Sequence, residues 1–428
     1  MVHGGRARRA LILLIAGAAY VVFLAVLLET ACAAYYRLRN HRFVSVARML
    51  AEEQNTFIRQ AKDDRNCTYL DTLFPHPYLA FVHHANPPCG IINTNNVGLF
   101  GRDFPAERDP RYFTILLTGG SVTAQLSGAG RTLAPNDLER VLNERYESPE
   151  GAGFQVLNGG DGAWKQPQQT ILFLLHAQAV DAVVTLDGYN DHGFLLNSEG
   201  TRFEAPAANF LTVNPWLETG PRKLLGVWIY GAIYRYSQRH WLTSHSYAAY
   251  GITRTVREAV RRWAEREPPG ARRTTPSSIF SLPNDWDRPR RYRWNLEEYR
   301  KYMRIIDAVA GRLGVRAAHF IQPVPAIART LTPEEARVVG DLSYTDSYAR
   351  MAAALLALNG EGIAVFSLLD VFSGVREPIY ADHIHCIVDP TTGESRGYRI
   401  MDERMADILE ANWHLRRKAT PGAVAPEQ

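Results

Sequence analysis

The chain has 428 residues, of which 46% are hydrophobic and 21% charged, and its formal net charge at pH 7 is +4. This length suits one large domain or two ordinary ones, and the composition is that of a mostly globular protein. The small net charge argues against a nucleic-acid-binding protein, for which a concentrated basic face would be expected.

An apolar run from about Ala10 to Leu28 follows three arginines, at positions 6, 8 and 9. A run of this length can cross the roughly 30 Å hydrocarbon core of a bilayer, and it exceeds the usual signal-peptide core of about 7–15 residues. Basic residues before such a run favour a cytoplasmic N-terminus. We therefore predict that residues 1–36 form an uncleaved, single-pass signal anchor in the inner (cytoplasmic) membrane, with the rest of the chain in the periplasm.

Two alternatives to a signal anchor stay open, a cleaved signal peptide and a lipid attached to Cys32. The second fits less well, because Glu29 stands where a lipobox has an apolar residue. Cys67 and Cys89 flank one short segment and could pair in an oxidising compartment, but two unpaired thiols fit their spacing equally well.

Residues 37–111 are predicted to form an N-terminal extension that packs on the main domain. Its first part, 37–65, has apolar residues at helical spacing and is predicted to be a helix that leaves the membrane. Its second part, 67–111, is rich in Pro, Asn, Gly and His, which indicates loops with short strands.

From Tyr112 onward, predicted strands and helices alternate along the chain. Strands are expected at 112–117, 154–157, 181–186, 315–322 and 363–368, and helices at 135–146, 166–177, 295–313, 333–339, 344–359 and 397–412. Such alternation indicates a parallel sheet with helices on both faces. We assign 112–415 to one α/β domain and 416–428 to a disordered tail.

Residues 193–293 interrupt this alternation and are predicted to be a mostly helical insertion. It contains an aromatic stretch from Trp228 to Trp241 and an amphipathic helix over 252–266. Two interpretations stay open: a lid or substrate-binding subdomain, or an elaboration that only covers the sheet edge.

Four short motifs carry residues suited to acyl transfer. Ser121 follows two glycines after the first strand, and Asp382 and His385 stand close together near the C-terminus. A serine hydroxyl needs a base to take its proton, which His385 can do near neutral pH, and the imidazolium needs a counter-charge such as Asp382. Two alternatives stay open: His383 could be the base in place of His385, and Asp382 could merely cap the segment that follows it.

The tetrahedral intermediate of acyl transfer also needs preorganised N–H donors for its oxyanion. We expect these from the backbone amide of Ser121, the backbone amide of Gly162 after the second strand, and the side-chain amide of Asn190 after the third. Ala163 is the alternative to Gly162, which is favoured because glycine tolerates close backbone approach. His76, His83 and His84 match no tight zinc pattern, so no metal site is predicted.

These motifs resemble the SGNH hydrolases, the GDSL-type esterase and lipase superfamily. Ser121, the glycine turn at Gly162, Gly188-Tyr189-Asn190-Asp191 and Asp382-x-x-His385 follow the order of that family's four blocks over roughly 112–412, the insertion excluded. One departure is Gly120, where the family's name motif has Asp before Ser. The resemblance implies a flavodoxin-like three-layer α/β/α sandwich with a five-stranded parallel sheet, and chemistry without a metal or organic cofactor.

The resemblance further implies a serine esterase, a membrane-anchored bacterial type, with catalytic Ser121, Asp382 and His385 and an oxyanion hole from Ser121, Gly162 and Asn190. The expected substrate is a small ester or the O-acyl groups of an extracytoplasmic glycan. An O-acyltransferase to a polysaccharide, and a non-catalytic anchored partner in exopolysaccharide assembly, are the alternatives.

Overall fold

The computed structural model describes residues 3–39, 43–53, 72–84, 92–126, 136–197, 200–205, 221–265, 280–389 and 392–418. They divide into two compact units. The smaller unit takes its described residues from Met1–Asn55 and Thr219–Arg272, and the larger one from Tyr69–Glu218 and Arg273–Gln428. Cys67 and Cys89, whose pairing the sequence leaves open, lie outside the described residues.

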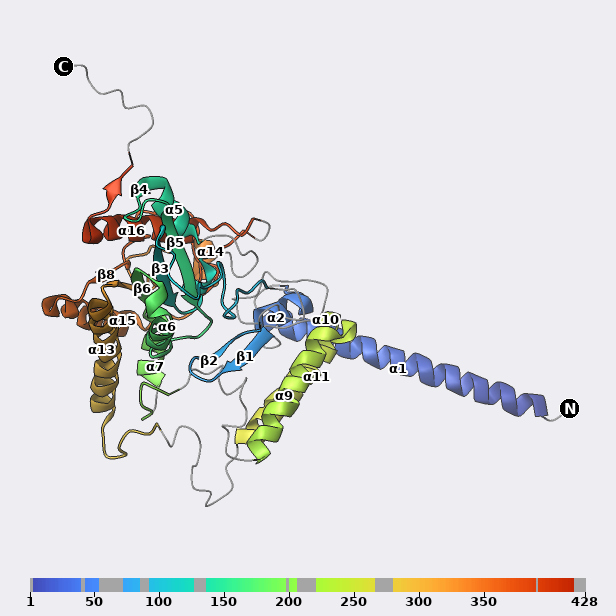
Figure 1. The fold of residues 1–428 in the computed structure, drawn as a ribbon. Helices are drawn as coiled ribbons and strands as arrows, with labels where there is room; N and C mark the ends of the chain where they lie inside the picture. Colours follow the sequence, from blue (N-terminus) through green and yellow to red (C-terminus); the bar gives the residue numbers. More distant parts are fainter. Residues whose placement is uncertain are drawn as a thin grey trace, which may run out of the picture. The chain divides into compact units, whose positions relative to one another are not determined.

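The larger unit is built on a five-stranded sheet with the order β5-β3-β6-β7-β8, in which every neighbouring pair is parallel (Figure 1). The strands are β3 (Tyr112–Gly119), β5 (Gly153–Gly160), β6 (Ala182–Asp187), β7 (Arg316–Ile321) and β8 (Val365–Ser367). In sequence order this is 2-1-3-4-5, the order of flavodoxin-like folds. The predicted fold class is therefore confirmed.

Helices cover both faces of this sheet, which is why its central strands β3 and β6 are buried along almost their whole length and mostly apolar. On one face α5 (Asp137–Arg145) packs against α16 (Arg396–Trp413), and on the other α6 (Gln168–His176) packs against α13 (Arg288–Leu313) (Figure 1). All six residues of β6 are buried between these layers.

The remaining elements of the larger unit are short. They are a hairpin of β1 (Leu73–His76) and β2 (Ala80–His83), the helices α4 (Ser121–Gln125), α7 (Tyr189–Asn197), α14 (Pro333–Ala336) and α15 (Thr345–Leu356), the 3-10 helices η3 (Ala177–Ala179) and η5 (Ala357–Glu361), and the two-residue strands β4 (Tyr146–Glu147) and β9 (Arg416–Arg417).

Some element boundaries differ from the sequence prediction for local reasons. Helix α13 begins at Arg288 rather than at 295, because the side chain of Asp287 caps it and Pro289 is compatible with its first turn. It ends where predicted, since Gly314 adopts the left-handed conformation that closes helices. Strand β8 is shorter than predicted, at Val365–Ser367.

The smaller unit contains helices α1 (His3–Arg39), α2 (Val46–Glu53), α9 (Pro221–Arg239), α10 (Trp241–His245) and α11 (Tyr247–Glu265). The predicted helix over 37–65 is therefore wrong in its first part, where α1 runs on to Arg39 and α2 follows as a separate helix. Within α1, Ile15–Arg39 is long and apolar enough to cross a membrane, and its most apolar 18-residue window has no buried residue. A signal sequence near an N-terminus meets the same criteria.

A buried ion pair in the larger unit fixes the segment that leads to Asp382. Glu335 bonds Arg329 at 2.8 Å, and both side chains are buried. Its carboxylate also accepts the amides of Ile379 at 2.9 Å and Tyr380 at 3.1 Å. Burial alone would raise the pKa of the Glu335 carboxyl, but these hydrogen bonds and Arg329 outweigh it and hold the pKa below its usual value.

We expect Glu335→Ala to lower the free energy of unfolding by about 3–5 kcal/mol, because it leaves the buried Arg329 without this carboxylate. Since the pKa of Glu335 is lower in the folded state, its contribution is present above the unfolded pKa of about 4.5 and is lost as the pH falls through the folded value. Equilibrium denaturation of the full chain at several pH values measures both effects. The exposed neighbour is the control: Glu334→Ala should change stability by no more than about 0.5 kcal/mol.

Candidate active site

Ser121 lies at the carboxyl end of β3, near the middle of the sheet, where ligands bind in open α/β folds. The strand ends at Gly119, and Ser121 is the first residue of α4. A side chain on Gly119 would collide with the Leu186 carbonyl oxygen, and a Cβ on Gly120 would lie 2.5 Å from Nδ2 of Asn190. The two glycines are therefore needed because neighbouring groups approach the backbone closely.

His385 connects Ser121 to Asp382. Its Nε2 lies 2.7 Å from the Ser121 hydroxyl oxygen, and its Nδ1 lies 3.0 Å and 3.1 Å from the two Asp382 carboxylate oxygens. His385 and Asp382 are each only 5% exposed, so water hardly competes for these hydrogen bonds. This arrangement allows the imidazole to accept the serine proton while the carboxylate holds the ring in place.

The Asp382 carboxylate is held by its own loop as well as by His385. One of its oxygens accepts the backbone amides of Ile384 at 2.9 Å and His385 at 2.8 Å. Burial alone would raise the pKa of Asp382, but the hydrogen bond and charge of His385, with these two amides, outweigh it and hold the pKa well below its usual range. These contacts thus favour the ionised form of Asp382.

His383, the alternative base, lies away from the serine. Its side chain is 52% exposed, and its Nδ1 is 3.9 Å from Asp382. Its ring lies 5.6 Å from that of Tyr189. The two aromatic side chains therefore border the triad, while His385 is the histidine that bonds Ser121.

Asn190 is brought beside Ser121 by the turn after β6. Gly188 has a φ of +130°, and α7 begins directly after it, which places Asn190 in the first helical turn. The Asn190 amide donates one hydrogen bond to the Trp164 carbonyl at 2.8 Å. Because a side-chain amide has two N–H groups, a second donor is left for an oxyanion near Ser121.

The turn after β5 holds the other expected donor. The Gly162 amide donates to the Asp161 carboxylate at 2.6 Å. An oxyanion would therefore have to replace this bond for Gly162 to act as donor. Ala163, the alternative, has a φ of +62°, in the left-handed region that favours glycine. The choice between Gly162 and Ala163 stays a prediction.

Buried polar residues beneath the site join the second and third motifs. Asp191 accepts the Gln166 amide at 3.0 Å, and Lys165 donates to the Gln166 carbonyl at 2.9 Å. Burial raises the pKa of Asp191 and lowers that of Lys165. Asp187 at the end of β6 accepts the Tyr299 hydroxyl at 2.5 Å. These contacts hold the turns that carry Gly162 and Asn190 against each other.

The N-terminal extension contributes a residue that the sequence did not single out for this site. His83 on β2 bonds Thr72 at 2.9 Å through Nδ1 and Asp161 at 3.1 Å through Nε2. His83 and Asp161 are fully buried, so His83 fixes the carboxylate that holds the Gly162 amide. The two residues are 78 positions apart, and no local pattern relates them.

Cys386, next to His385, is a free and buried cysteine. Burial and nearby carboxylates raise its pKa well above the usual value, so it stays a neutral thiol.

Comparison with known proteins gives a limited result. No family model and no curated protein matches the chain. Among solved structures, Axe2, an acetylxylan esterase from Geobacillus stearothermophilus, aligns with 13% identity and a TM-score of 0.33, over 70% of this chain and 92% of that one. A variant of the same esterase with one tryptophan replaced by isoleucine aligns with 12% identity and a TM-score of 0.32, over 75% and 99%. A likeness at these TM-scores carries no conclusion about activity.

We expect His83→Ala to lower the free energy of unfolding by about 1–3 kcal/mol, because the buried Asp161 carboxylate loses this partner. Thermal or chemical denaturation of the full chain measures the loss. His84→Ala is the matched control and should cost at most about 0.5 kcal/mol. Equal losses in the two variants would contradict the role of the His83–Asp161 bond.

Proposed function

We propose that this chain is an SGNH-type serine esterase that acts through an acyl-enzyme on Ser121. The single observation that carries the proposal is the continuous set of hydrogen bonds from Ser121 through His385 to Asp382, with distances of 2.7 Å and 3.0 Å. Hydroxyl, imidazole and carboxylate in this order are the parts that serine acyl transfer requires.

In the proposed reaction, the Ser121 oxygen attacks the ester carbonyl carbon while His385 Nε2 takes the hydroxyl proton. The oxyanion that forms accepts hydrogen bonds from the Ser121 backbone amide, the second N–H of Asn190 and the amide of Gly162 or Ala163. His385 then returns the proton to the leaving alcohol. Water, activated by the same imidazole, releases the acid and restores the serine.

The substrate class we propose is an O-acylated glycan outside the cytoplasm, with a small acyl group such as acetyl. The aromatic rings of Tyr189 and His383 beside the triad offer a surface on which a sugar can stack. As a signal anchor in the cytoplasmic membrane, α1 would place the larger unit in the periplasm. No nucleic acid and no cofactor takes part in the proposed reaction.

A second candidate uses the same acyl-enzyme but a sugar hydroxyl in place of water, which makes the chain an O-acyltransferase. The half-exposed His383–Tyr189 border favours it, because an acceptor sugar could bind there next to the acylated serine. Product analysis with and without an added glycan acceptor separates hydrolysis from transfer. The third candidate is a non-catalytic assembly partner. Such a protein would not require hydrogen bonds that join Ser121, His385 and Asp382, so this arrangement argues against it.

We expect Ser121→Ala to abolish hydrolysis of a short-chain aryl ester by the purified chain, and to abolish labelling by a fluorophosphonate probe. Asp382→Asn should keep the probe site but lower kcat by about 10³–10⁴, because a neutral amide cannot balance the imidazolium or fix its tautomer. Steady-state kinetics of both variants beside the wild type provides the measurement. Unchanged activity in Ser121→Ala would sink the nucleophile assignment.

We expect Asn190→Ala to lower kcat by about 10²–10³ with little change in KM, because the lost N–H binds the oxyanion and not the ground-state ester. The control is Asn284→Ala at an exposed asparagine, which should keep full activity. A rise in KM at unchanged kcat would instead assign Asn190 to substrate binding.

A further inference from the structure

The smaller unit exposes large apolar side chains on two neighbouring helices. On α9 and α11 these side chains are between 38% and 66% exposed. They are Leu225, Trp228 and Tyr236 of α9, and Ile252, Val256 and Trp263 of α11. Within each helix they recur at intervals of three, four, seven or eight residues, which places them on one side of that helix. We call this set the apolar face.

Helices α9 and α11 pack as an antiparallel pair, and Leu225 and Tyr236 of α9 point to the same side of the pair as the apolar residues of α11. Gly226 lies against Ala264 at one end of the contact, and Arg257 lies over the rings of Tyr230 and Tyr234 further along, at 5.9 Å and 5.3 Å. In α11 the apolar residues lie roughly a third of a turn from this contact. In α9, Leu225 and Tyr236 lie roughly a third to two fifths of a turn from it in the same rotational sense, and Trp228 lies about half a turn from it. Antiparallel helices with that relation share one outer face.

Helix α1 holds the start of α11. The Glu29 carboxylate accepts the Ser246 hydroxyl at 2.6 Å and the amides of Tyr247 and Ala248 at 2.7 Å and 3.0 Å, and so caps α11. Tyr36 packs on Tyr250 with ring centroids 5.3 Å apart. The pair of helices is therefore attached to α1 just after its apolar run ends.

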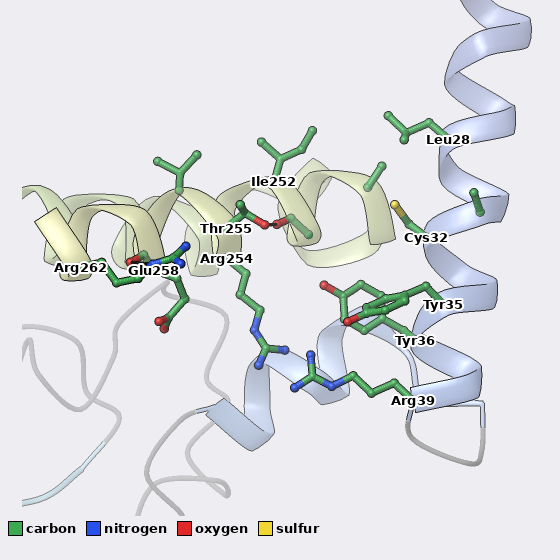
Figure 2. Close-up of a pocket in the computed structure, with 14 residues that line it drawn as sticks. Leu28, Cys32, Tyr35, Tyr36, Arg39, Ile252, Arg254, Thr255, Glu258 and Arg262 are labelled. Atoms are coloured by element: carbon green, nitrogen blue, oxygen red, sulfur yellow. Dashed lines mark hydrogen bonds between the residues drawn. The ribbon is translucent and has the colours of Figure 1, made fainter.

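Where α11 crosses α1, side chains of both helices line an open groove of about 670 Å³ (Figure 2). Leu28 and Ile252 lie on one side of α11, and Arg254 and Arg39 lie on the other. Ile252 of the apolar face thus points toward the same side as Leu28, in the N-terminal, apolar part of α1. The arginines point toward its C-terminal end.

We propose that the α9–α11 pair lies in the surface layer of the bilayer that α1 crosses, with its apolar face among the upper acyl chains. The proposal rests on the proposed membrane anchoring by α1. A basic, Trp-containing amphipathic helix pair attached at the end of a membrane span fits this location, where aromatic rings are favoured. Beside its apolar residues the pair carries Arg222, Arg235, Arg239 and Arg262, whose charge complements anionic phospholipid headgroups.

The test uses the full chain reconstituted in vesicles that contain anionic phospholipid brominated near the top of the acyl chains, which quench nearby tryptophans. We expect clear quenching of the wild type. Trp228→Phe combined with Trp263→Phe should lower the quenchable emission roughly twofold or more, because these rings lie among the lipids. The matched control is Trp286→Phe in the larger unit, which should leave the quenchable emission unchanged. An equal fall in both variants would overturn the proposal.

A second variant keeps every tryptophan. Ile252→Asp combined with Val256→Asp should remove most of the quenching, while circular dichroism retains the helix content and ester hydrolysis is kept. A chain that resists alkaline extraction but shows no quenching overturns this inference, and one that is released by extraction overturns the anchoring by α1 instead. Unquenched tryptophans together with a cross-linked dimer would assign the apolar face to a second copy, which also overturns it. If vesicles of purely neutral phospholipid quench the tryptophans equally, the proposed attraction between the arginines and anionic headgroups is overturned.

Discussion

The hydrogen bond between the Asp382 carboxylate and His385 is the interaction on which the candidate site depends. A buried carboxylate is costly unless its charge is balanced and its oxygens are bonded. Here the loop folds back so that the amides of Ile384 and His385 meet the carboxylate, while the imidazole supplies a further donor. The same folding directs Nε2 at Ser121. The Arg329–Glu335 pair fixes the preceding segment at Ile379, so the loop starts from a rigid point.

The other half of the site follows from the parallel sheet. Strands β3, β5 and β6 are neighbours and end at the same edge, so the turns that carry Ser121, Gly162 and Asn190 lie at one edge although they are far apart in the sequence. At this edge the Leu186 carbonyl oxygen lies so close to Gly119 that a side chain there would have no room. Beneath it, the bond from Gln166 to Asp191 ties two of the three turns together. The positions of the donors thus depend on buried polar contacts as much as on the strands.

The sequence predicts the sheet well because a strand buried on both faces is a continuous apolar run, as in 113–117 and 182–186. It also places Ser121, Gly162 and Asn190 at one edge, since each of their motifs follows a strand end, whereas Asp382 and His385 lie in the segment between β8 and α16. The bonds from His83 to Asp161 and from Glu335 to Ile379 were not predictable, because they join distant segments and leave no periodic trace.

Helix α9 was missed for a different physical reason. A surface helix is recognised by one apolar stripe and one polar face, but α9 has apolar or aromatic residues on two sides. Tyr230 and Tyr234 lie against α11, while Leu225, Trp228 and Tyr236 face outward. A helix that packs on the protein with one side and contacts lipid with another has apolar residues on both sides. It therefore lacks the clear division into one apolar and one polar face by which surface helices are recognised. All residues of the candidate site come from the larger unit, so the ester chemistry and the proposed membrane contact can change independently.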